Sequence, residues 1–136
     1  MTQKIIRAAA HIASHRDEKL QLGNLEIHRD WGWAPDYVNA MWLMLQTDEP
    51  QDLVIATGRT VSLAYFVERA FAHFDLDWRD HVRSDPSLLR PSDIAFGAGD
   101  PALAATQLGW KASHDVDDVI RLMCSASVDR RQDPRA

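Results

Sequence analysis

Cysteine is nearly absent from this sequence, which excludes one common way of stabilising a small fold. The chain has a single cysteine, Cys124, among its 136 residues, so no internal disulfide can form. A chain without disulfides fits a reducing compartment, and we expect a cytoplasmic protein in which Cys124 serves as a small apolar side chain. No apolar run approaches the ~20 residues of a membrane-spanning helix, and the N-terminus has no signal-peptide core. We therefore expect no membrane partner.

Basic charge is also scarce. The chain has 15 lysine and arginine residues against 20 aspartate and glutamate residues, for a net charge of -5. Neutralising the phosphates of a nucleic acid requires clustered lysine and arginine side chains, so we expect no nucleic-acid partner. A chain of this length suits one domain, which can bury roughly two-thirds of its unfolded surface.

The hydrophobic pattern predicts an α/β (mixed α+β) fold of about five helices with short strands. Helices are expected over residues 3–14, 35–46, 63–74 and 101–108 and from about residue 115, and short strands over residues 20–22, 27–31 and 53–56. Residues 75–99 are expected to be rich in loops. The last stretch is charged and has no periodicity. We therefore expect a domain over residues 1–126 and a flexible tail over residues 127–136.

Several residues mark the expected helix ends. Pro35 suits the first turn of a helix, where a missing N–H costs nothing. Ser62 is a good N-cap for a helix whose apolar stripe should face the core. Gly109 suits a left-handed C-cap, and Ser113 or Asp115 should begin the last helix.

Residues 97–102 read Gly-Ala-Gly-Asp-Pro-Ala, which formally matches a dinucleotide-binding fingerprint. Asp100 would place negative charge where the pyrophosphate must bind, and it suits the cap of the following helix better. Only 34 residues follow Ala102, too few for the rest of a Rossmann domain. We therefore expect no cofactor site in this chain.

His11 and His15 have the four-residue spacing that can place two imidazoles on one metal ion. Two ligands do not make a site, and no further histidine or cysteine stands at a suitable spacing. A solvated helix face is the better interpretation, and no metal site is expected.

Residues 22–38 form the most informative segment of the chain. Arg29 lies between a strand-like stretch and a helix that begins near Pro35, and a guanidinium held in this way suits a diphosphate. The alternative is a surface salt bridge from Arg29 to Asp30 or Asp36. Either tryptophan of this segment could stack on a base or line a sugar pocket, but core packing is the better interpretation. These are Trp31 and Trp33.

The segment 22–38 closely resembles the L-G-N-L-x-x-x-R-D-W-G-x-A-x-D-Y-V segment of GDP-mannose 4,6-dehydratases, which are extended short-chain dehydrogenase/reductase enzymes. The resemblance covers roughly residues 2–125 and continues through residues 41–46, 54–58, 90–91, 99–101 and 108–110. It departs from the family at Gln3, where arginine is usual, at Trp33, where histidine is common, and at Asp93, where glutamate is usual.

The resemblance implies a set of substrate-binding residues. The family's arginines at the positions of Arg29 and Arg90 hold the nucleotide diphosphate, and an acidic residue at the position of Asp93 contacts the nucleotide. Lys4 matches a family lysine on the helix that lines the nucleotide site. Asn24, in the turn at residues 23–24, and Lys19 lie beside that site and are weaker candidates.

The resemblance also shows what this chain lacks. The family's NADP-binding Rossmann domain, with its glycine-rich turn and Tyr-x-x-x-Lys pair, has no counterpart here. The nearest match to the pair is Tyr65-Phe66-Val67-Glu68-Arg69, and arginine cannot replace the lysine because its pKa is too high. We therefore expect the substrate-binding part alone, without catalytic or cofactor-binding residues and inactive by itself.

In the full family enzyme, bound NADP oxidises C4 of GDP-mannose, water is eliminated across C5 and C6, and reduction at C6 gives GDP-4-keto-6-deoxymannose. The resemblance implies GDP-mannose or GDP as the ligand and a separate N-terminal Rossmann half as a possible partner. By resemblance, the apolar stripes over residues 37–45 and 63–74 partly face a larger domain, so we expect an exposed patch and a homo-oligomer. The alternative function is a non-catalytic relic that acts as an oligomerising interaction domain.

Overall fold

The computed structural model describes residues 1–89 and 92–132, with side chains described up to residue 128. It confirms the expected mixed fold of helices and short strands. In chain order, the elements are α1 (Thr2–Ile12), β1 (Leu20–Leu22), β2 (His28–Asp30), α2 (Ala34–Met44), β3 (Thr60–Ser62), α3 (Leu63–Ala72), α4 (Trp78–His81), β4 (Val82–Ser84), the 3-10 helix η1 (Pro86–Leu88), α5 (Ala102–Leu108) and α6 (Val116–Gln132). No helix within the described ranges is long and apolar enough to span a membrane.

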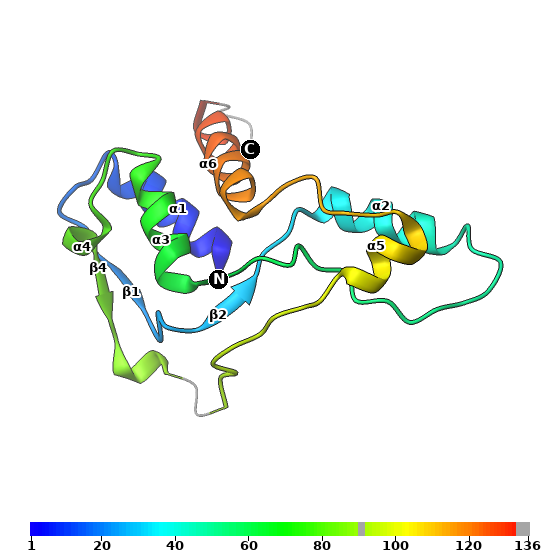
Figure 1. Cartoon of the computed structure of the whole chain (residues 1–136). Helices are drawn as coiled ribbons and strands as arrows, with labels where there is room; N and C mark the ends of the chain where they lie inside the picture. Colours follow the sequence, from blue (N-terminus) through cyan, green and yellow to red (C-terminus); the bar gives the residue numbers. More distant parts are fainter. Residues whose placement is uncertain (90–91, 133–136) are drawn as a thin grey trace.

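Helices α1, α3 and α6 pack against one another and enclose the main core (Figure 1). Each helix contributes fully buried side chains, among them Ile5, Phe66, Phe71 and Val116. Cys124 of α6 belongs to the same core, and burial raises the pKa of its thiol to about 12. Cys124 is thus an apolar core residue, as expected.

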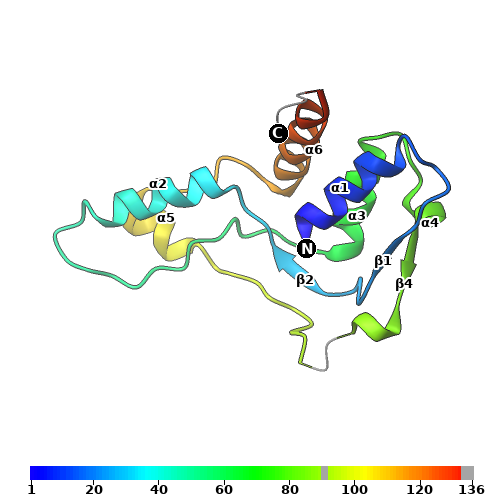
Figure 2. The ribbon, with the colours of Figure 1, turned by 180° about the vertical axis from the view of Figure 1, so that it is seen from behind.

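Two pairs of short strands lie beside these helices (Figure 2). Strand β1 pairs with β4 in parallel, and β2 pairs with β3 in antiparallel fashion, with Arg29 opposite Val61. The other edge of β2 contacts the segment 95–97, where the His28 amide donates to the Ala95 carbonyl at 2.8 Å. Strand β2 is therefore held from both sides.

The expected helix ends are confirmed where a side chain or a glycine determines them. The Ser62 hydroxyl accepts a hydrogen bond from the Tyr65 amide at 3.1 Å, which caps α3. Helix α5 ends at Gly109, whose φ of 62° is left-handed. Of the two candidates for the start of α6, Asp115 is the cap, because its carboxylate accepts from the amides of Asp117 and Asp118.

Helices α2 and α5 form a smaller lobe beside the main core (Figure 1). Its own cluster is small and consists of Ala40, Ala104 and Trp110 with partly buried neighbours. Asp36 of α2 connects this lobe to the segment that precedes α6. Its carboxylate accepts hydrogen bonds from the amides of Ser113 and His114, each at 2.9 Å. This lobe is therefore held to the main body partly by polar bonds.

One expectation about secondary structure was wrong in position. Residues 53–56 form no strand, since they have no ladder partner within the described ranges, and Val54 is 53% exposed instead of buried. The strand of this region is β3, a few residues later. Helix α6 continues to Gln132 and so enters the segment expected as a tail, of which residues 133–136 lie outside the described residues.

A polar network around Asp117 joins the start of β3 to α3 and α6. Arg59 Nη1 lies 2.8 Å from the Asp115 carboxylate and 3.0 Å from that of Asp117. The Tyr65 hydroxyl accepts from Arg59 and donates to Asp117, each at 2.9 Å. Arg69 Nε donates to Asp117 at 3.0 Å. Burial opposes ionisation of Asp117, but the hydrogen bonds from Tyr65, Arg59 and Arg69 outweigh it and lower the pKa of the carboxyl.

We predict that Asp117→Asn lowers the free energy of unfolding at pH 7 by about 1 kcal/mol, because the network is charged but partly exposed. The folded pKa of Asp117 lies below its unfolded value near ~3.9, so its stabilisation is complete above that pH and is lost as the pH falls through the folded pKa. Urea unfolding between pH 2 and pH 7 should therefore show a shallower acid decline in the variant.

The matched control is Asp48→Asn, because Asp48 is exposed and its carboxylate has no hydrogen-bond partner among the described residues. The control should leave both the stability and its pH dependence unchanged. An equal effect of the two substitutions would contradict the role given to the Asp117 network.

Candidate functional site

A concave site lies where the start of α1, the end of β1 and the segment after β4 meet. It is a pocket of about 590 Å³ lined by Met1, Lys4, Leu22, Gly23, Asn24, Ile27, Ser87, Leu88, Leu89 and Asp93. Its size falls in the range of ~300–1,000 Å³ that is usual for small-molecule sites. It brings together three of the expected site residues, Lys4, Asn24 and Asp93, from three distant parts of the sequence.

Local hydrogen bonds place the pocket's polar side chains. The Lys4 ammonium donates to the Gln21 carbonyl at 2.9 Å, so α1 and β1 are joined at the rim. The Asn24 carboxamide oxygen accepts from the Glu26 amide at 2.9 Å, which closes a turn and leaves the NH₂ group of Asn24 available as a donor.

The opposite wall approaches β1 closely. The Asp85 amide donates to the Leu22 carbonyl at 2.8 Å, and the Asp85 carboxylate accepts from the amide and hydroxyl of Ser87. The Ser87 hydroxyl and amide lower the pKa of Asp85 through these hydrogen bonds. A Cβ atom on Gly23 would lie 2.7 Å from the Leu88 carbonyl oxygen, so only glycine allows this approach.

Arg29 does not line this pocket. Its Nη1 donates to the His28 carbonyl at 2.7 Å, and its side chain runs beside Gly97. Ile27, which directly precedes β2, lines the pocket. Because side chains two apart on extended backbone point to the same face, we expect Arg29 to point to the side of Ile27. The alternative salt bridge is not found among the described residues, where Asp30 and Asp36 both have other partners.

Two other expected residues do not meet in this pocket. Arg90 lies outside the described residues. Lys19 donates to the Asp80 carbonyl at 2.8 Å beyond the far end of β1 and does not line the pocket. Ile27 and residues 87–89 also line the pocket but were not expected there. Residues 87–89 reach it through contacts with a segment ~60 residues earlier in the chain, for which the sequence has no local signal.

Comparison with known proteins gives the family. A family model described as GDP-mannose 4,6 dehydratase matches residues 1–123. The chain belongs to the GDP-mannose 4,6-dehydratase family. A GDP-mannose 4,6 dehydratase 1 of Arabidopsis thaliana is 40% identical over 123 residues, which cover 90% of this chain and 34% of that enzyme. The GDP-mannose 4,6 dehydratase of Homo sapiens is 40% identical over 154 aligned residues, which cover all of this chain and 41% of the relative.

Solved structures agree with the fold. RMD from Pseudomonas aeruginosa, complexed with NADPH, matches with a TM-score of 0.76 at 19% identity over 93% of this chain and 43% of that one. A UDP-glucose-4-epimerase from Stenotrophomonas maltophila, with bound NAD, matches with a TM-score of 0.76 at 22% identity. This dehydratase-family chain thus has the fold of part of an extended short-chain dehydrogenase/reductase. It spans between 34% and 43% of the length of these relatives.

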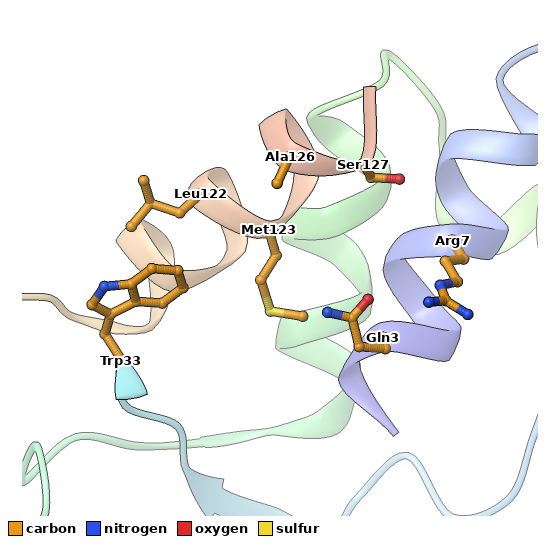
Figure 3. A pocket seen from close by; sticks show the side chains of 7 residues that line it. All are labelled: Gln3, Arg7, Trp33, Leu122, Met123, Ala126 and Ser127. Carbon is orange, nitrogen blue, oxygen red and sulfur yellow. The ribbon is translucent and has the colours of Figure 1, made fainter. Parts of the chain in front are cut away.

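A second concavity of about 360 Å³ lies between α1 and α6 (Figure 3). Gln3 and Arg7 come from α1, and Leu122 and Met123 come from α6. Trp33, which directly precedes α2, also lines this groove. Trp33 is half-buried and lines this groove instead of the core, so the core interpretation fails for it. It holds for Trp31, whose ring lies 5.2 Å from that of Phe66 in the main cluster.

The remaining candidate motifs have structural explanations. The rings of His11 and His15 stack with centroids 4.2 Å apart, and His11 Nε2 lies 3.0 Å from the Glu18 carboxylate. No three metal-binding side chains converge within the described ranges. In the glycine-rich segment, the Asp100 carboxylate accepts from the Ala102 amide at 2.9 Å, which closes a turn just before α5. The N-cap of α5 is Pro101, so Asp100 is not the cap that the sequence suggested.

We predict that Gly23→Ala lowers the free energy of unfolding by about 1–3 kcal/mol, because the added Cβ forces the Leu88 backbone to move. The matched control is Gly97→Ala, whose Cβ would meet its neighbours at 3.6 Å, an ordinary contact distance. Urea unfolding of both variants measures the difference. Equal stabilities would show that the 86–89 segment is not held against β1.

Proposed function

We propose that residues 1–126 form the nucleotide-sugar-binding domain of a cytoplasmic GDP-mannose 4,6-dehydratase-type protein and bind the GDP part of GDP-mannose. One observation carries this proposal. Three residues expected to bind the nucleotide, Lys4, Asn24 and Asp93, line the same pocket although they are far apart in the sequence.

The pocket's polar groups suit a nucleoside diphosphate. The Lys4 ammonium has three donors, of which one is used by the Gln21 carbonyl, so two remain for phosphate oxygens. The NH₂ group of Asn24 adds neutral donors, and the Asp93 carboxylate can accept hydrogen bonds from a base or a ribose. Alternation along the extended chain is expected to place Arg29 on the same side as Ile27, which lines the pocket. In this proposal its fork turns to the diphosphate on binding, together with Arg90.

The chemistry of the full reaction is proposed to require a separate Rossmann half that carries NADP. In this chain the Tyr65 hydroxyl and Arg69 both bind Asp117, so the pair that resembles the family's catalytic motif is engaged in the fold. The chain alone would therefore hold GDP-mannose without converting it to GDP-4-keto-6-deoxymannose.

We predict that Arg29→Ala and Arg90→Ala each weaken GDP binding about tenfold or more, because each removes charge-assisted hydrogen bonds to a phosphate of roughly 1.5–3 kcal/mol. Arg29→Lys should restore the affinity only in part, since it keeps the charge but loses the fork. Titration calorimetry with GDP and with GDP-mannose measures this, and the affinity should fall with added salt.

The control for this experiment is Arg79→Ala, which removes an exposed arginine of α4 that lies outside the pocket. It should leave GDP affinity unchanged. If GDP binds the wild-type chain and neither Arg29→Ala nor Arg90→Ala weakens it, the assignment of the diphosphate site is wrong.

A second candidate function is an oligomerising interaction domain, and the surface of α2 favours it. Val38, Met41, Trp42 and Leu45 are 57–81% exposed, and their spacing places them on one face of the helix. Large apolar patches are rare on monomeric proteins and mark interaction sites. The other expected stripe, over residues 63–74, is not exposed, because α3 buries Phe66, Val67, Ala70 and Phe71 in the core.

We predict that the chain self-associates at micromolar concentrations through this face of α2. The double substitution Trp42→Lys with Leu45→Lys should shift sedimentation velocity profiles towards monomer, because it places charge in the apolar contact. Ile94→Lys is the control, since Ile94 is equally exposed at 67% but lies far from α2 in the sequence and outside the stripe. A wild-type chain that sediments as a clean monomer would count against this function.

A further inference from the structure

Asp30 follows Arg29 directly, and its carboxylate is fully engaged within the chain. One oxygen accepts from the Thr57 hydroxyl at 2.7 Å and from the Thr57 amide at 3.2 Å. The other accepts from the Gly58 amide at 2.8 Å. These bonds join the end of β2 to the turn that leads into β3, 27 and 28 residues away.

The turn at residues 57–59 is built to present these donors. Gly58 has a φ of 79°, a left-handed conformation that glycine adopts without strain. The Thr57 hydroxyl oxygen also accepts from the Arg59 amide at 3.1 Å, which closes the turn on itself. Two successive amides therefore point at the Asp30 carboxylate, and such charge-assisted bonds are among the stronger ones in proteins.

Strand β2 needs such an anchor because it is short. It has three residues, and its ladder with β3 pairs Arg29 with Val61 and Asp30 with Thr60. A slip of one residue in a strand moves every side chain to the opposite face. If β2 slipped, Arg29 would leave the face it shares with Ile27 and the pocket.

We infer that Asp30 is a positioning residue, which fixes the register of β2 against the 57–59 turn and so holds Arg29 on the pocket side of the strand. The inference rests on the proposed function, because it assigns Arg29 to the bound diphosphate. Asp30 itself does not line the pocket. Its three hydrogen bonds point its carboxylate at residues 57 and 58.

A double-mutant cycle separates positioning from a general structural role. Asp30→Ala should weaken GDP binding roughly tenfold, about as much as Arg29→Ala does. When Asp30→Ala is added to the Arg29→Ala variant, the further loss of affinity should be less than about twofold. Equal losses in both backgrounds would show that Asp30 supports the whole pocket and not Arg29. No loss from Asp30→Ala, with a loss from Arg29→Ala, would overturn the inference and leave the proposed function intact.

If GDP does not bind the wild-type chain, that result refutes the proposed function alone. A measurement without ligand then tests the inference about Asp30. Asp30→Ala should raise the picosecond-to-nanosecond mobility of the Arg29 Nε–H group in ¹⁵N relaxation and speed amide exchange at Arg29 and Val61. The matched control is Asp77→Ala, which removes a comparable carboxylate cap, from the Arg79 amide at 2.9 Å, outside β2. Unchanged mobility and exchange in Asp30→Ala would overturn the inference.

Thr57→Val is the second variant, in case Asp30→Ala fails to fold. It removes the hydroxyl bond to Asp30 at 2.7 Å and the bond from the Arg59 amide to the same hydroxyl, keeps both amide bonds to Asp30 and nearly preserves the side-chain shape. It should move GDP affinity and Arg29 mobility in the same direction by a smaller amount. A folded Thr57→Val chain that matches the wild type in both measurements would contradict the inference.

Discussion

Helix α3 buries its apolar stripe against both α1 and α6, and the rest of the molecule depends on this contact. Its aromatic side chains, Phe66 and Phe71, are fully buried, and burial of such side chains dominates the stability of a small core. The packing fixes the start of α1, and with it Lys4, beside the end of β1. No wall of the pocket comes from α3 itself. The packing of the three helices shapes the pocket indirectly, because it places α1 and therefore Lys4.

Three aspartates connect segments that apolar packing does not hold together. Asp30 joins β2 to the 57–59 turn, Asp36 joins α2 to residues 113–114, and Asp117 joins α6 to Arg59 and Arg69. Each carboxylate links segments that are distant in the sequence, and two of them use backbone amides that would otherwise lack partners. This arrangement suits a lobe with little core of its own, where the cluster around Trp110 is small.

The α2 lobe exposes apolar surface at two places. One face of α2 is apolar and exposed, and residues 53–56 have the apolar, β-branched composition of a strand without a ladder partner in the described part of the chain. From Trp31 to Gly58 there is no basic residue, while Asp48, Glu49 and Asp52 are exposed.

The sequence by itself determined the ends of three helices, because a side chain or a glycine marks them: Ser62 begins α3, Gly109 ends α5 and Asp115 begins α6. It did not predict the short helix α4, which lies in a stretch expected to be rich in loops. It also determined the family and, through it, three residues of the pocket. It could not place the strands reliably, since a strand exists only where a second one pairs with it, and residues 53–56 lack that partner whereas β3 finds β2. Only the tertiary structure decided that Trp33 lines a groove, that Lys19 turns to Asp80 and that residues 87–89 close the pocket. These outcomes depend on contacts between distant segments, and the free energies of such contacts leave no local pattern in the sequence.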